Sequence, residues 1–359
     1  MLTRHHERRR GAAGEPAAAT AATDHLLSPL SLRALVITNM YPTREHPALG
    51  SFVRDQVEAL RALPNLDVEL MSFAPGGPGA YAGAAREVRR RYRAERFDVV
   101  HAHFGLTAWP ALVAPARFRA VTLHGTDLSH PRSRAITSAA LRFVDLIATV
   151  SSSLANQLPR GAVSRRAVVL PCGVDTKRFK PISRAQARVA LGLNPEGRYL
   201  LFPADPRRVE KRHDRALAVA GDVPLLTLGG VDPSQVPLWV NAANAVLVPS
   251  EREGFGLAVL EALACEVPVL ATPVGIAPMV LNGVAGTVCT AFDAGGWRAA
   301  SARHLEDPDP RIPGRARAEL FSAARMAARV AAAWSAMPFT SSPILGRLSA
   351  VRPKQHHES

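Results

Sequence analysis

The chain has 359 residues, 47% of them hydrophobic, and a formal net charge of +14. This length predicts two domains, and no hydrophobic run approaches the roughly 20 residues of a membrane-spanning helix. The three cysteines, Cys172, Cys265 and Cys289, are far apart and have no metal-binding or redox spacing, and their odd number argues against a disulfide framework. They are predicted to be small buried residues in a reducing compartment. The positive charge is compatible with binding to nucleic acid, to an anionic membrane surface or to an anionic substrate, and it can also result simply from an arginine-rich genome.

Strands alternate with helices through the first half of the chain. Residues 1–30 are rich in Arg, Ala, Gly and Pro without periodicity, which predicts a disordered basic tail. The predicted strands are 33–38, 68–73, 98–104, 120–128, 145–150 and 167–171, and the predicted helices are 51–63, 85–96, 106–116 and 134–143. This alternation predicts a parallel, doubly wound α/β sheet.

The same pattern restarts after Pro181. Strands are predicted at 199–204, 224–229, 244–249 and 267–272, and helices at 185–191, 297–305 and 316–334. We therefore expect one Rossmann-like domain over 31–175 and a second over 176–318. A C-terminal helix over 319–337 is expected to pack back on the first domain, and 338–359 to form a disordered tail.

The stretch from Val248 to Ala271 reads VPSEREGFGLAVLEALACEVPVLA and holds the most specific pattern in the chain. Residues 257–264 have helical composition and are apolar on nearly all sides, which predicts a buried helix. Its one ionisable residue, Glu261, follows Glu253 at a distance of eight residues. A helix N-terminus flanked by glycines suits an anion, and carboxylates suit hydroxyl groups. An anion surrounded by hydroxyls is a good description of a sugar nucleotide.

Most of the unusual polar residues follow predicted strands, and ligands of open α/β sheets bind beyond the carboxyl ends of strands. Gly50 and Ser51 open a helix whose N–H groups can meet a phosphate, and Ser51 can cap it. His124 can donate to a hydroxyl or act as a general base, although in isolation a structural histidine bonded to a carbonyl is the better interpretation. Lys211 can neutralise a diphosphate. The other members of this set are Asn39, His101, His103, Asp127, Ser151, Arg207 and Arg208. No metal site is predicted, because the two histidines of 101–103 lack a third ligand at suitable spacing.

Seven stretches between Arg33 and Ala285 carry a family resemblance. They are SFVRDQVEAL, VVHAHFG, VTLHGTD, LPCGVDTKRF, VEKRHD, EGFGLAVLE and EALACEVPVLATPVG. The chain resembles a family 4 retaining glycosyltransferase of the GT-B fold, and the stretches occur in that family's order. The resemblance implies two Rossmann-like domains facing across a cleft, with a nucleotide-sugar donor held by the second and an acceptor by the first. It also implies retention at the anomeric carbon and no metal.

The same resemblance assigns roles to single residues. Glu261 is expected to bind the ribose hydroxyls, Glu253 the donor sugar and Lys211 the diphosphate, with His124 near the reacting centre and Gly50 approaching the phosphate. The donor is also expected to meet the loop and helix start formed by Gly254, Phe255, Gly256 and Leu257. The chain departs from the family pattern where an arginine usually follows the strand. That position falls near Pro206, so Arg207 and Arg208 are both candidates. Cys172 and Met279 stand where asparagine and glutamate are frequent.

These observations predict a metal-independent hexosyltransferase with a UDP- or GDP-sugar as donor and no other cofactor. The expected acceptor is a lipid, a glycan or a small molecule, and the expected place is the cytoplasm, peripheral at the inner face of the membrane. No nucleic acid is expected. A nicotinamide dehydrogenase fits less well, because Val259 replaces the third glycine of its fingerprint. A sugar-nucleotide epimerase, a phosphorylase or a non-enzymatic protein that binds surfaces through the basic segment 86–96 remains an alternative.

Overall fold

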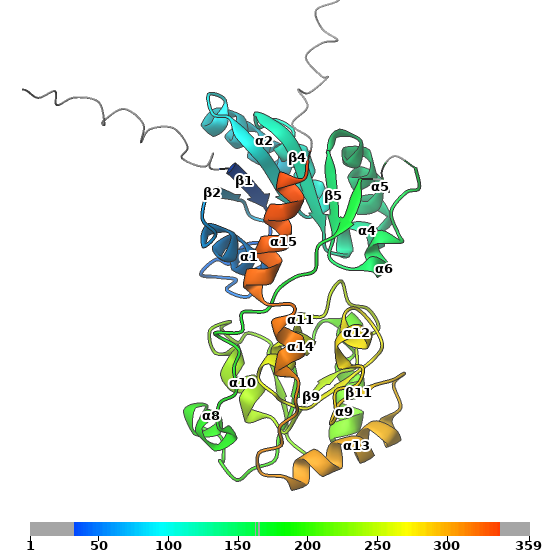
Figure 1. Ribbon diagram of the computed structural model, residues 1–359. Coiled ribbons are helices and arrows are strands. Elements are labelled where there is room, and N and C mark those ends of the chain that lie inside the picture. The colour runs from blue at the N-terminus through cyan, green and yellow to red at the C-terminus, as the bar shows by residue number, and fades with distance from the viewer. Residues whose placement is uncertain (1–31, 162, 164–165, 338–359) are drawn as a thin grey trace, which may run out of the picture. The chain divides into compact units, whose positions relative to one another are not determined.

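The fold is described from a computed structural model (Figure 1), in which residues 32–161, 163 and 166–337 are placed well enough to describe. The tails predicted to be disordered, 1–30 and 338–359, lie outside the described residues. The described chain forms two all-parallel sheets with helices packed on them, which confirms the predicted α/β class. Within these ranges, no helix has the length and apolar character needed to cross a membrane.

The first sheet has six strands in the order β2-β1-β3-β4-β5-β6. They are β1 Leu32–Thr38, β2 Leu66–Ser72, β3 Phe97–His103, β4 Ala116–Leu123, β5 Leu146–Thr149 and β6 Ala167–Val169. Successive side chains of a strand point to opposite faces, and both faces here are covered. Ala34 and Val36 accordingly belong to one buried cluster, while Leu35 and Ile37 belong to another on the opposite face.

Eight helical segments lie among the described residues of this first half. They are α1 Ser51–Arg61, α2 Pro78–Tyr92, η1 Gly105–Thr107, α3 Ala108–Ala111, α4 Thr126–Ser129, α5 Pro131–Ala140, η2 Leu141–Phe143 and α6 Ser152–Ala155. The helix predicted over 106–116 is wrong: the chain makes a 3₁₀ turn and one α turn, and β4 already begins at Ala116. Pro115 cannot continue a helix, and it restricts the residue before it to extended conformations.

The second sheet has five strands in the order β11-β10-β9-β7-β8. They are β7 Leu200–Phe202, β8 Leu225–Thr227, β9 Ala245–Val248, β10 Val269–Ala271 and β11 Val288–Cys289. Its helical segments are α8 Arg184–Ala190, η3 Val209–Lys211, α9 His213–Ala220, α10 Val236–Ala242, α11 Leu257–Ala264, α12 Ala277–Leu281, α13 Ala294–Glu306 and α14 Arg315–Glu319. The sequence patterns did not predict α10, α12 or β11, which are short.

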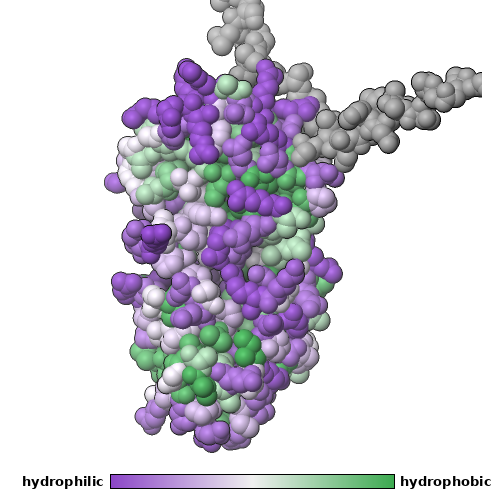
Figure 2. Space-filling view, turned by 90° about the vertical axis from the view of Figure 1, so that its left-hand side faces the viewer, coloured by the Kyte–Doolittle hydropathy of each residue, from purple (hydrophilic) through white to green (hydrophobic). Residues whose placement is uncertain are grey.

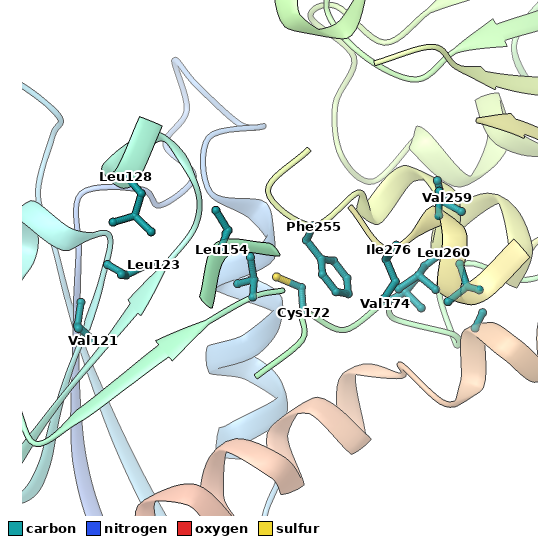
Figure 3. Close-up of a cluster of buried hydrophobic side chains, with 14 of the residues drawn as sticks. Val121, Leu123, Leu128, Leu154, Cys172, Val174, Phe255, Val259, Leu260 and Ile276 are labelled. Atoms are coloured by element: carbon teal, nitrogen blue, oxygen red, sulfur yellow. The ribbon is translucent and has the colours of Figure 1, made fainter. Parts of the chain in front are cut away.

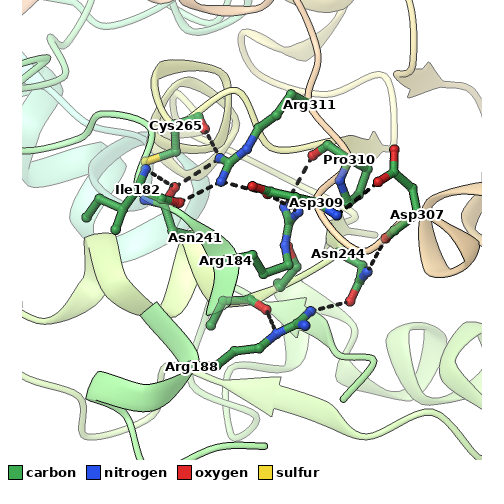
Figure 4. Close-up of polar contacts among 12 residues, drawn as sticks. Ile182, Arg184, Arg188, Asn241, Asn244, Cys265, Asp307, Asp309, Pro310 and Arg311 are labelled. Atoms are coloured by element: carbon green, nitrogen blue, oxygen red, sulfur yellow. Dashed lines mark hydrogen bonds and ion pairs between the residues drawn. The ribbon is translucent and has the colours of Figure 1, made fainter. Parts of the chain in front are cut away.

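Buried arginines lock the second half together (Figure 4). Arg184 donates to the carbonyl of Ala243 at 2.8 Å and pairs with Asp309 at 2.6 Å. Arg188 donates to the side-chain oxygen of Asn244 at 2.8 Å, and Asn244 in turn donates to the carbonyl of His304 at 3.0 Å. A buried charge is costly unless it is paired and hydrogen-bonded, so these contacts fix α8 against the start of β9 and the segment after α13.

The chain returns to the first sheet through its last helix, α15 Ala323–Ser335. Val174 and Ser322 form a parallel bridge where the outgoing and returning segments run side by side. α15 then packs on α1, and the indole of Trp334 donates to Nδ1 of His101 at 3.2 Å. In Figure 1 α15 crosses in front of the first sheet, beside α1. The face drawn in Figure 2 is mostly hydrophilic, with hydrophobic residues in smaller separate areas, as expected for a chain rich in exposed arginine.

Candidate active site

The strand order of the second sheet reverses between β7 and β9: β8 lies on one side of β7, and β9, β10 and β11 follow on the other side. Doubly wound sheets bind ligands in the crevice beyond the carboxyl ends of strands at this switch point. A small cavity of about 10 Å³ lies there, and Lys211, Ser250 and Glu253 are among the residues that line it. The structure therefore brings together two of the predicted catalytic residues, which are 42 residues apart in the sequence.

Lys211 and Glu253 form a two-pronged ion pair. The ammonium nitrogen lies 2.7 Å from Oε1 and 2.6 Å from Oε2 of the carboxylate. Ser250 donates a further hydrogen bond to Oε1 at 2.8 Å. The two side chains are 17% and 8% exposed, so water competes little with the pair. Three donated hydrogen bonds leave the carboxylate some acceptor capacity, and the lysine can still turn one proton towards another anion.

The loop that carries Glu253 is fixed by close backbone contacts. A Cβ added to Gly254 would overlap the carbonyl of His124, so a glycine is required for this approach. The carbonyl of Phe255 accepts from the N–H of Ile276 at 2.7 Å, and Gly256 has a φ of 98°. The ring of Phe255 lies in a buried apolar cluster beside Cys172 (Figure 3). The side chain of Phe255 therefore anchors the loop.

The helix predicted over 257–264 is confirmed as α11, with Gly256 as its N-cap in the left-handed region. No side chain caps this N-terminus. Among the described residues, the N–H groups of Phe255, Gly256 and Leu257 donate to no protein acceptor. A helix start with free N–H groups and a positive dipole end favours an anion.

Glu261 lies on the first turns of α11 and is partly buried. Burial raises its pKa from 4.5 to about 7, the nearby Arg178 acts in the opposite direction, and Asp55 adds to the increase. Its carboxylate accepts no hydrogen bond from any residue that the structure describes. A carboxylate in such surroundings gains free energy from any hydroxyl group that donates to it.

His124 follows β4 in a turn that Asp127 organises. The buried carboxylate of Asp127 accepts from the N–H groups of Gly125 at 2.8 Å, His124 at 3.1 Å and Gly105 at 3.2 Å. Burial raises the pKa of Asp127, and these backbone hydrogen bonds act against that increase. Asp127 thus fixes the backbone at the ends of β3 and β4 and does not itself face a ligand.

The histidines predicted at strand ends form a buried chain. Nδ1 of His103 lies 3.1 Å from Nε2 of His124, and Nε2 of His103 lies 3.2 Å from the side-chain nitrogen of Gln56. With Gln56 donating to His103, His103 donates to His124, which leaves Nδ1 of His124 protonated. Burial lowers the pKa of His103 to about 4 and that of His124 well below its usual 6.5. His124 is therefore a neutral imidazole at physiological pH.

Gly50 lies at the start of α1, and this start is close to His124. Gly50 is the helix N-cap with a φ of 63°, and a Cβ there would overlap the carbonyl of Met40. The prediction that Ser51 caps the helix is wrong: Gly50 is the N-cap, Ser51 is the first helical residue, and no side chain caps this helix start. The ring of Phe52 packs on the imidazole of His124 with centroids 4.9 Å apart. The structure thus places the start of α1, the turn of His124 and the loop of Glu253 in one neighbourhood.

The side chains of Arg207 and Arg208 do not line the cavity that Lys211 and Glu253 share. The guanidinium of Arg207 pairs with Asp205 at 2.6 Å, and that of Arg208 pairs with Glu210 at 2.7 Å. Both are exposed, Arg207 to 88%. Their short-range pairing follows from the spacing, since each acid lies two residues away on the same loop.

Two residues of this neighbourhood were missed by sequence reasoning. Ser250 directly follows the Pro that ends β9, and its place between a strand and Glu253 was a usable signal. Arg178 pairs with Asp55 of α1 at 2.6 Å and also acts on the pKa of Glu261. Nothing in the sequence indicates this link, because Arg178 and Asp55 are 123 residues apart.

Within the described residues there is no group of three or more His, Cys, Asp or Glu side chains that could hold a metal ion. All three cysteines are free, with Cys172 and Cys265 buried and Cys289 partly buried. The polar groups of the site are therefore a lysine, carboxylates, a neutral imidazole and backbone N–H groups. This set suits the binding of an anion that carries hydroxyl groups.

Comparison with known proteins identifies the class. Residues 36–178 match the family model described as Glycosyltransferase Family 4, and residues 199–307 match the model described as Glycosyl transferases group 1. The D-inositol 3-phosphate glycosyltransferase of Pseudarthrobacter chlorophenolicus is 26% identical over 327 residues, covering 76% of this chain and 76% of the relative. The enzyme of the same name from Mycobacterium sp. (strain KMS) is 30% identical over 256 residues, covering 56% of this chain and 57% of its own length.

Solved structures agree on the fold. Sucrose-phosphate synthase from Thermosynechococcus elongatus has a TM-score of 0.63 at 19% identity, over 85% of this chain and 98% of the other. Anabaena HepE, solved in complex with UDP and glucose, has a TM-score of 0.62 at 15% identity, over 85% of this chain and 100% of the other. Fold and site thus define a glycosyltransferase of GT-B architecture. The chain belongs to glycosyltransferase family 4, also described as group 1, as the sequence motifs predicted.

Proposed function

We propose that the protein is a metal-independent, retaining hexosyltransferase that takes its sugar from a UDP- or GDP-sugar. The observation that carries this proposal is the ion pair of Lys211 and Glu253 at the switch point between β7 and β9. A cation for the diphosphate and a carboxylate for the sugar meet there at 2.6 Å. Eight residues further on, Glu261 supplies a carboxylate without a protein partner for the ribose.

Departure of the nucleoside diphosphate builds negative charge on its phosphates. Lys211 neutralises this charge by turning part of its hydrogen bonding from Glu253 to the diphosphate. The free N–H groups of Phe255, Gly256 and Leu257 at the start of α11 stabilise the same charge. A lysine and helix N–H groups thereby supply the electrostatic stabilisation that a bound divalent cation supplies in other enzymes.

Glu253 holds the donor sugar through hydroxyl groups that donate to its carboxylate. Its position between Lys211 and the turn of His124 sets the sugar close to both the leaving group and the first domain. Glu261 holds the ribose hydroxyls in the same manner, and each such bond to a charged acceptor contributes about 1.5–3 kcal/mol.

Retention follows if the acceptor hydroxyl attacks from the side of the leaving diphosphate and gives its proton to a phosphate oxygen. No protein base is then needed. His124 is neutral because burial lowers its pKa, so its Nδ1–H can donate to the sugar or the acceptor without charge repulsion against the developing positive sugar. We therefore assign His124 a hydrogen-bonding role near the reacting centre.

The relatives and structural neighbours support the choice of donor and acceptor. HepE is solved with UDP and with UDP-glucose, which favours a uridine donor here. The sequence relatives are glycosyltransferases named for D-inositol 3-phosphate, which places a polyol phosphate among the acceptors to test, beside carbohydrate and lipid-linked acceptors. No nucleic-acid partner is proposed.

We also propose that the protein works in the cytoplasm and attaches peripherally to the inner face of the membrane. Free cysteines suit a reducing compartment. The last turns of α2 present exposed arginines, which attract anionic lipid headgroups. Salt-sensitive flotation with anionic liposomes tests the attachment, and flotation that is absent or independent of salt contradicts it.

The proposed activity is tested in two steps. A thermal-shift panel of UDP-, GDP- and ADP-sugars identifies the donor, since a ligand that binds the native state raises the melting temperature. That donor is then incubated with candidate acceptors in the presence and absence of EDTA, and the product is examined by NMR. We expect transfer that EDTA does not abolish and a product whose anomeric configuration equals that of the donor. An inverted product, or isomerisation of the donor without transfer, contradicts the proposal.

A further inference from the structure

A second cavity, of about 700 Å³, lies at the amino ends of strands of the first sheet, opposite the carboxyl ends where His103 and His124 lie. It is lined by Phe97 and Ala116, the first residues of β3 and β4, which lie side by side in the sheet register. β3 ends at His103, next to the turn of His124. The seven residues of β3 separate these two ends of the sheet, which corresponds to roughly 20 Å. The cavity is therefore distinct from the neighbourhood of Lys211 and Glu253, and no donor-binding role accounts for it.

The lining of this cavity is strongly basic. Arg93, Arg96, Arg117 and Arg119 all line it, against one acidic residue, Glu95. Glu95 is already bound, because its carboxylate pairs with Arg33 at 2.6 Å. Basic side chains gather here for a local reason as well. α2 ends at Tyr92, and the carbonyl end of a helix favours positive charge in its last turn.

The arginines of the cavity divide into fixed and available groups. Arg119 is held by the carbonyls of Ala114 at 3.0 Å and Leu112 at 3.3 Å, and its Nε is buried without a partner. Arg117 pairs with Asp98 at 3.3 Å. Arg93 and Arg96 are exposed and make no ion pair or hydrogen bond with any residue that the structure describes. The cavity thus combines one positioned guanidinium with two that are available to an incoming ligand.

One wall of the cavity is aromatic. Phe143 lines it with 52% of its surface exposed, and the ring of Trp109, 38% exposed, lies 6.4 Å from Phe143 between centroids. Solvation of a group of arginines does not explain exposed aromatic rings beside it, and grouped exposed apolar surface indicates a binding site. Guanidinium groups fit phosphate oxygens in a two-pronged manner, and aromatic rings suit an apolar part attached to the phosphate.

We propose that this cavity is a second ligand site, which binds a phosphate ester through Arg93, Arg96 and Arg119 and packs its organic part on Phe143. The ester has two sources of the same chemistry, a soluble phosphate monoester or the headgroup of an anionic phospholipid. The site does not depend on the sugar-transfer reaction, because no residue of the donor neighbourhood contributes to it.

The test compares two double variants of the full-length protein. Arg93→Ala with Arg96→Ala removes the two available guanidinium groups of the cavity. Arg132→Ala with Arg325→Ala removes the same charge from exposed positions that lie outside α2 and do not line the cavity. The probes are sn-glycerol 3-phosphate, titrated by calorimetry, and vesicles of phosphatidylglycerol against vesicles of phosphatidylcholine, assayed by flotation. Titration with UDP verifies that each variant is folded and keeps its other site.

We expect the Arg93/Arg96 variant to lose at least tenfold in affinity and the Arg132/Arg325 variant to lose less than twofold. Loss with glycerol 3-phosphate identifies a soluble ester as ligand. Loss confined to phosphatidylglycerol vesicles identifies a lipid headgroup. Equal losses in the two variants mean attraction by the overall basic charge and overturn the proposal, as does unchanged binding or the absence of binding to both probes. None of these outcomes bears on sugar transfer.

Discussion

Glu253 and Glu261 are eight residues apart, yet the protein treats their carboxylates in opposite ways. Glu253 lies in a glycine loop and is held by Lys211 at 2.6 Å and by Ser250 at 2.8 Å. Glu261 lies on α11, and no described residue donates a hydrogen bond to it. The first carboxylate is oriented before a ligand arrives. The second is left in unfavourable surroundings that a hydroxyl-bearing ligand improves.

The contrast between the two carboxylates suggests how the region around the start of α11 can bind both the sugar and the ribose of one donor. Where charge develops during the reaction, the protein needs groups fixed in advance, because reorganisation adds to the barrier. Where the ligand is only bound, a carboxylate without a protein partner gives more binding free energy, since no existing hydrogen bond must be broken. We therefore propose that the Lys211–Glu253 pair serves catalysis and that Glu261 serves affinity.

The largest effect is expected from Lys211→Ala. It removes the cation that we propose stabilises the leaving diphosphate, and it leaves Glu253 with the hydroxyl of Ser250 alone. Turnover should fall by roughly 10²–10³-fold, the range found when a preorganised group that stabilises developing charge is removed. Release of the nucleoside diphosphate under saturating donor measures it, and circular dichroism verifies folding. Turnover within a few-fold of the wild type would remove Lys211 from the mechanism.

Gly254→Ala should produce the next effect, by separating the loop of Glu253 from the turn of His124. A Cβ at residue 254 would overlap the carbonyl of His124, and this carbonyl belongs to the backbone, so it can move only if the turn of His124 shifts. We expect a loss of about 1–3 kcal/mol in the free energy of unfolding and a roughly tenfold or greater fall in turnover. Gly83→Ala in α2 is the matched control, because a Cβ there meets nothing within 4 Å. The control should be neutral or stabilising by up to ~1 kcal/mol. Equal behaviour of the two variants would contradict the close contact.

Glu261→Gln sharpens the comparison through pH. Burial raises the pKa of Glu261 from 4.5 to about 7, so the native state keeps a proton that the unfolded chain has released between these values. The free energy of unfolding of the wild type therefore falls as pH rises through this window. Ribose hydroxyls donate to the ionised carboxylate, so affinity for the nucleoside diphosphate should fall as pH drops below about 7.

In Glu261→Gln both of these pH dependences should disappear, and affinity at pH 8 should fall about tenfold, which corresponds to roughly 1.4 kcal/mol. Titration calorimetry and chemical unfolding between pH 5 and pH 8 measure the two quantities. A Gln variant that keeps the wild-type pH profile would assign the titration to another group.

The smallest effect is expected from His103→Phe, which keeps a ring between His101 and His124 but removes the nitrogen that contacts His124 at 3.1 Å. His124 then loses its orienting partner, and turnover should fall a few-fold to about tenfold with little change in donor affinity. Thr122→Val is the control, since it breaks only the 2.7 Å contact with His101. If Thr122→Val lowers turnover as much, the effect is one of stability alone.

Sequence reasoning reached the parts of this structure that depend on neighbouring residues. The bounds of α11 follow from Gly256 and a run without Gly or Pro, and the position of Lys211 after β7 follows from strand alternation. The helix predicted over 106–116 is wrong although Pro110 and Pro115 are visible in the sequence. How the chain turns between these two prolines depends on the sheet on which it packs.

Contacts between distant segments could not be predicted. The pairing of Lys211 with Glu253 spans 42 residues, and the contact of Trp334 with His101 spans 233. Such contacts depend on which helix faces which strand, and a residue's own sequence context does not encode this. The pairing of the Arg207 and Arg208 guanidinium groups has a different, local origin, since an acid two residues away binds each of them.

The central claim is that Glu253 holds the sugar while Glu261 holds the ribose. Calorimetric titration of wild type, Glu253→Gln and Glu261→Gln, each with the nucleoside diphosphate and with the complete nucleotide sugar, tests it most directly. We predict that Glu261→Gln weakens both ligands about equally. Glu253→Gln should weaken only the nucleotide sugar and leave the nucleoside diphosphate bound at least as tightly, because Lys211 is released from its pair. Equal weakening of both ligands in Glu253→Gln would contradict the account.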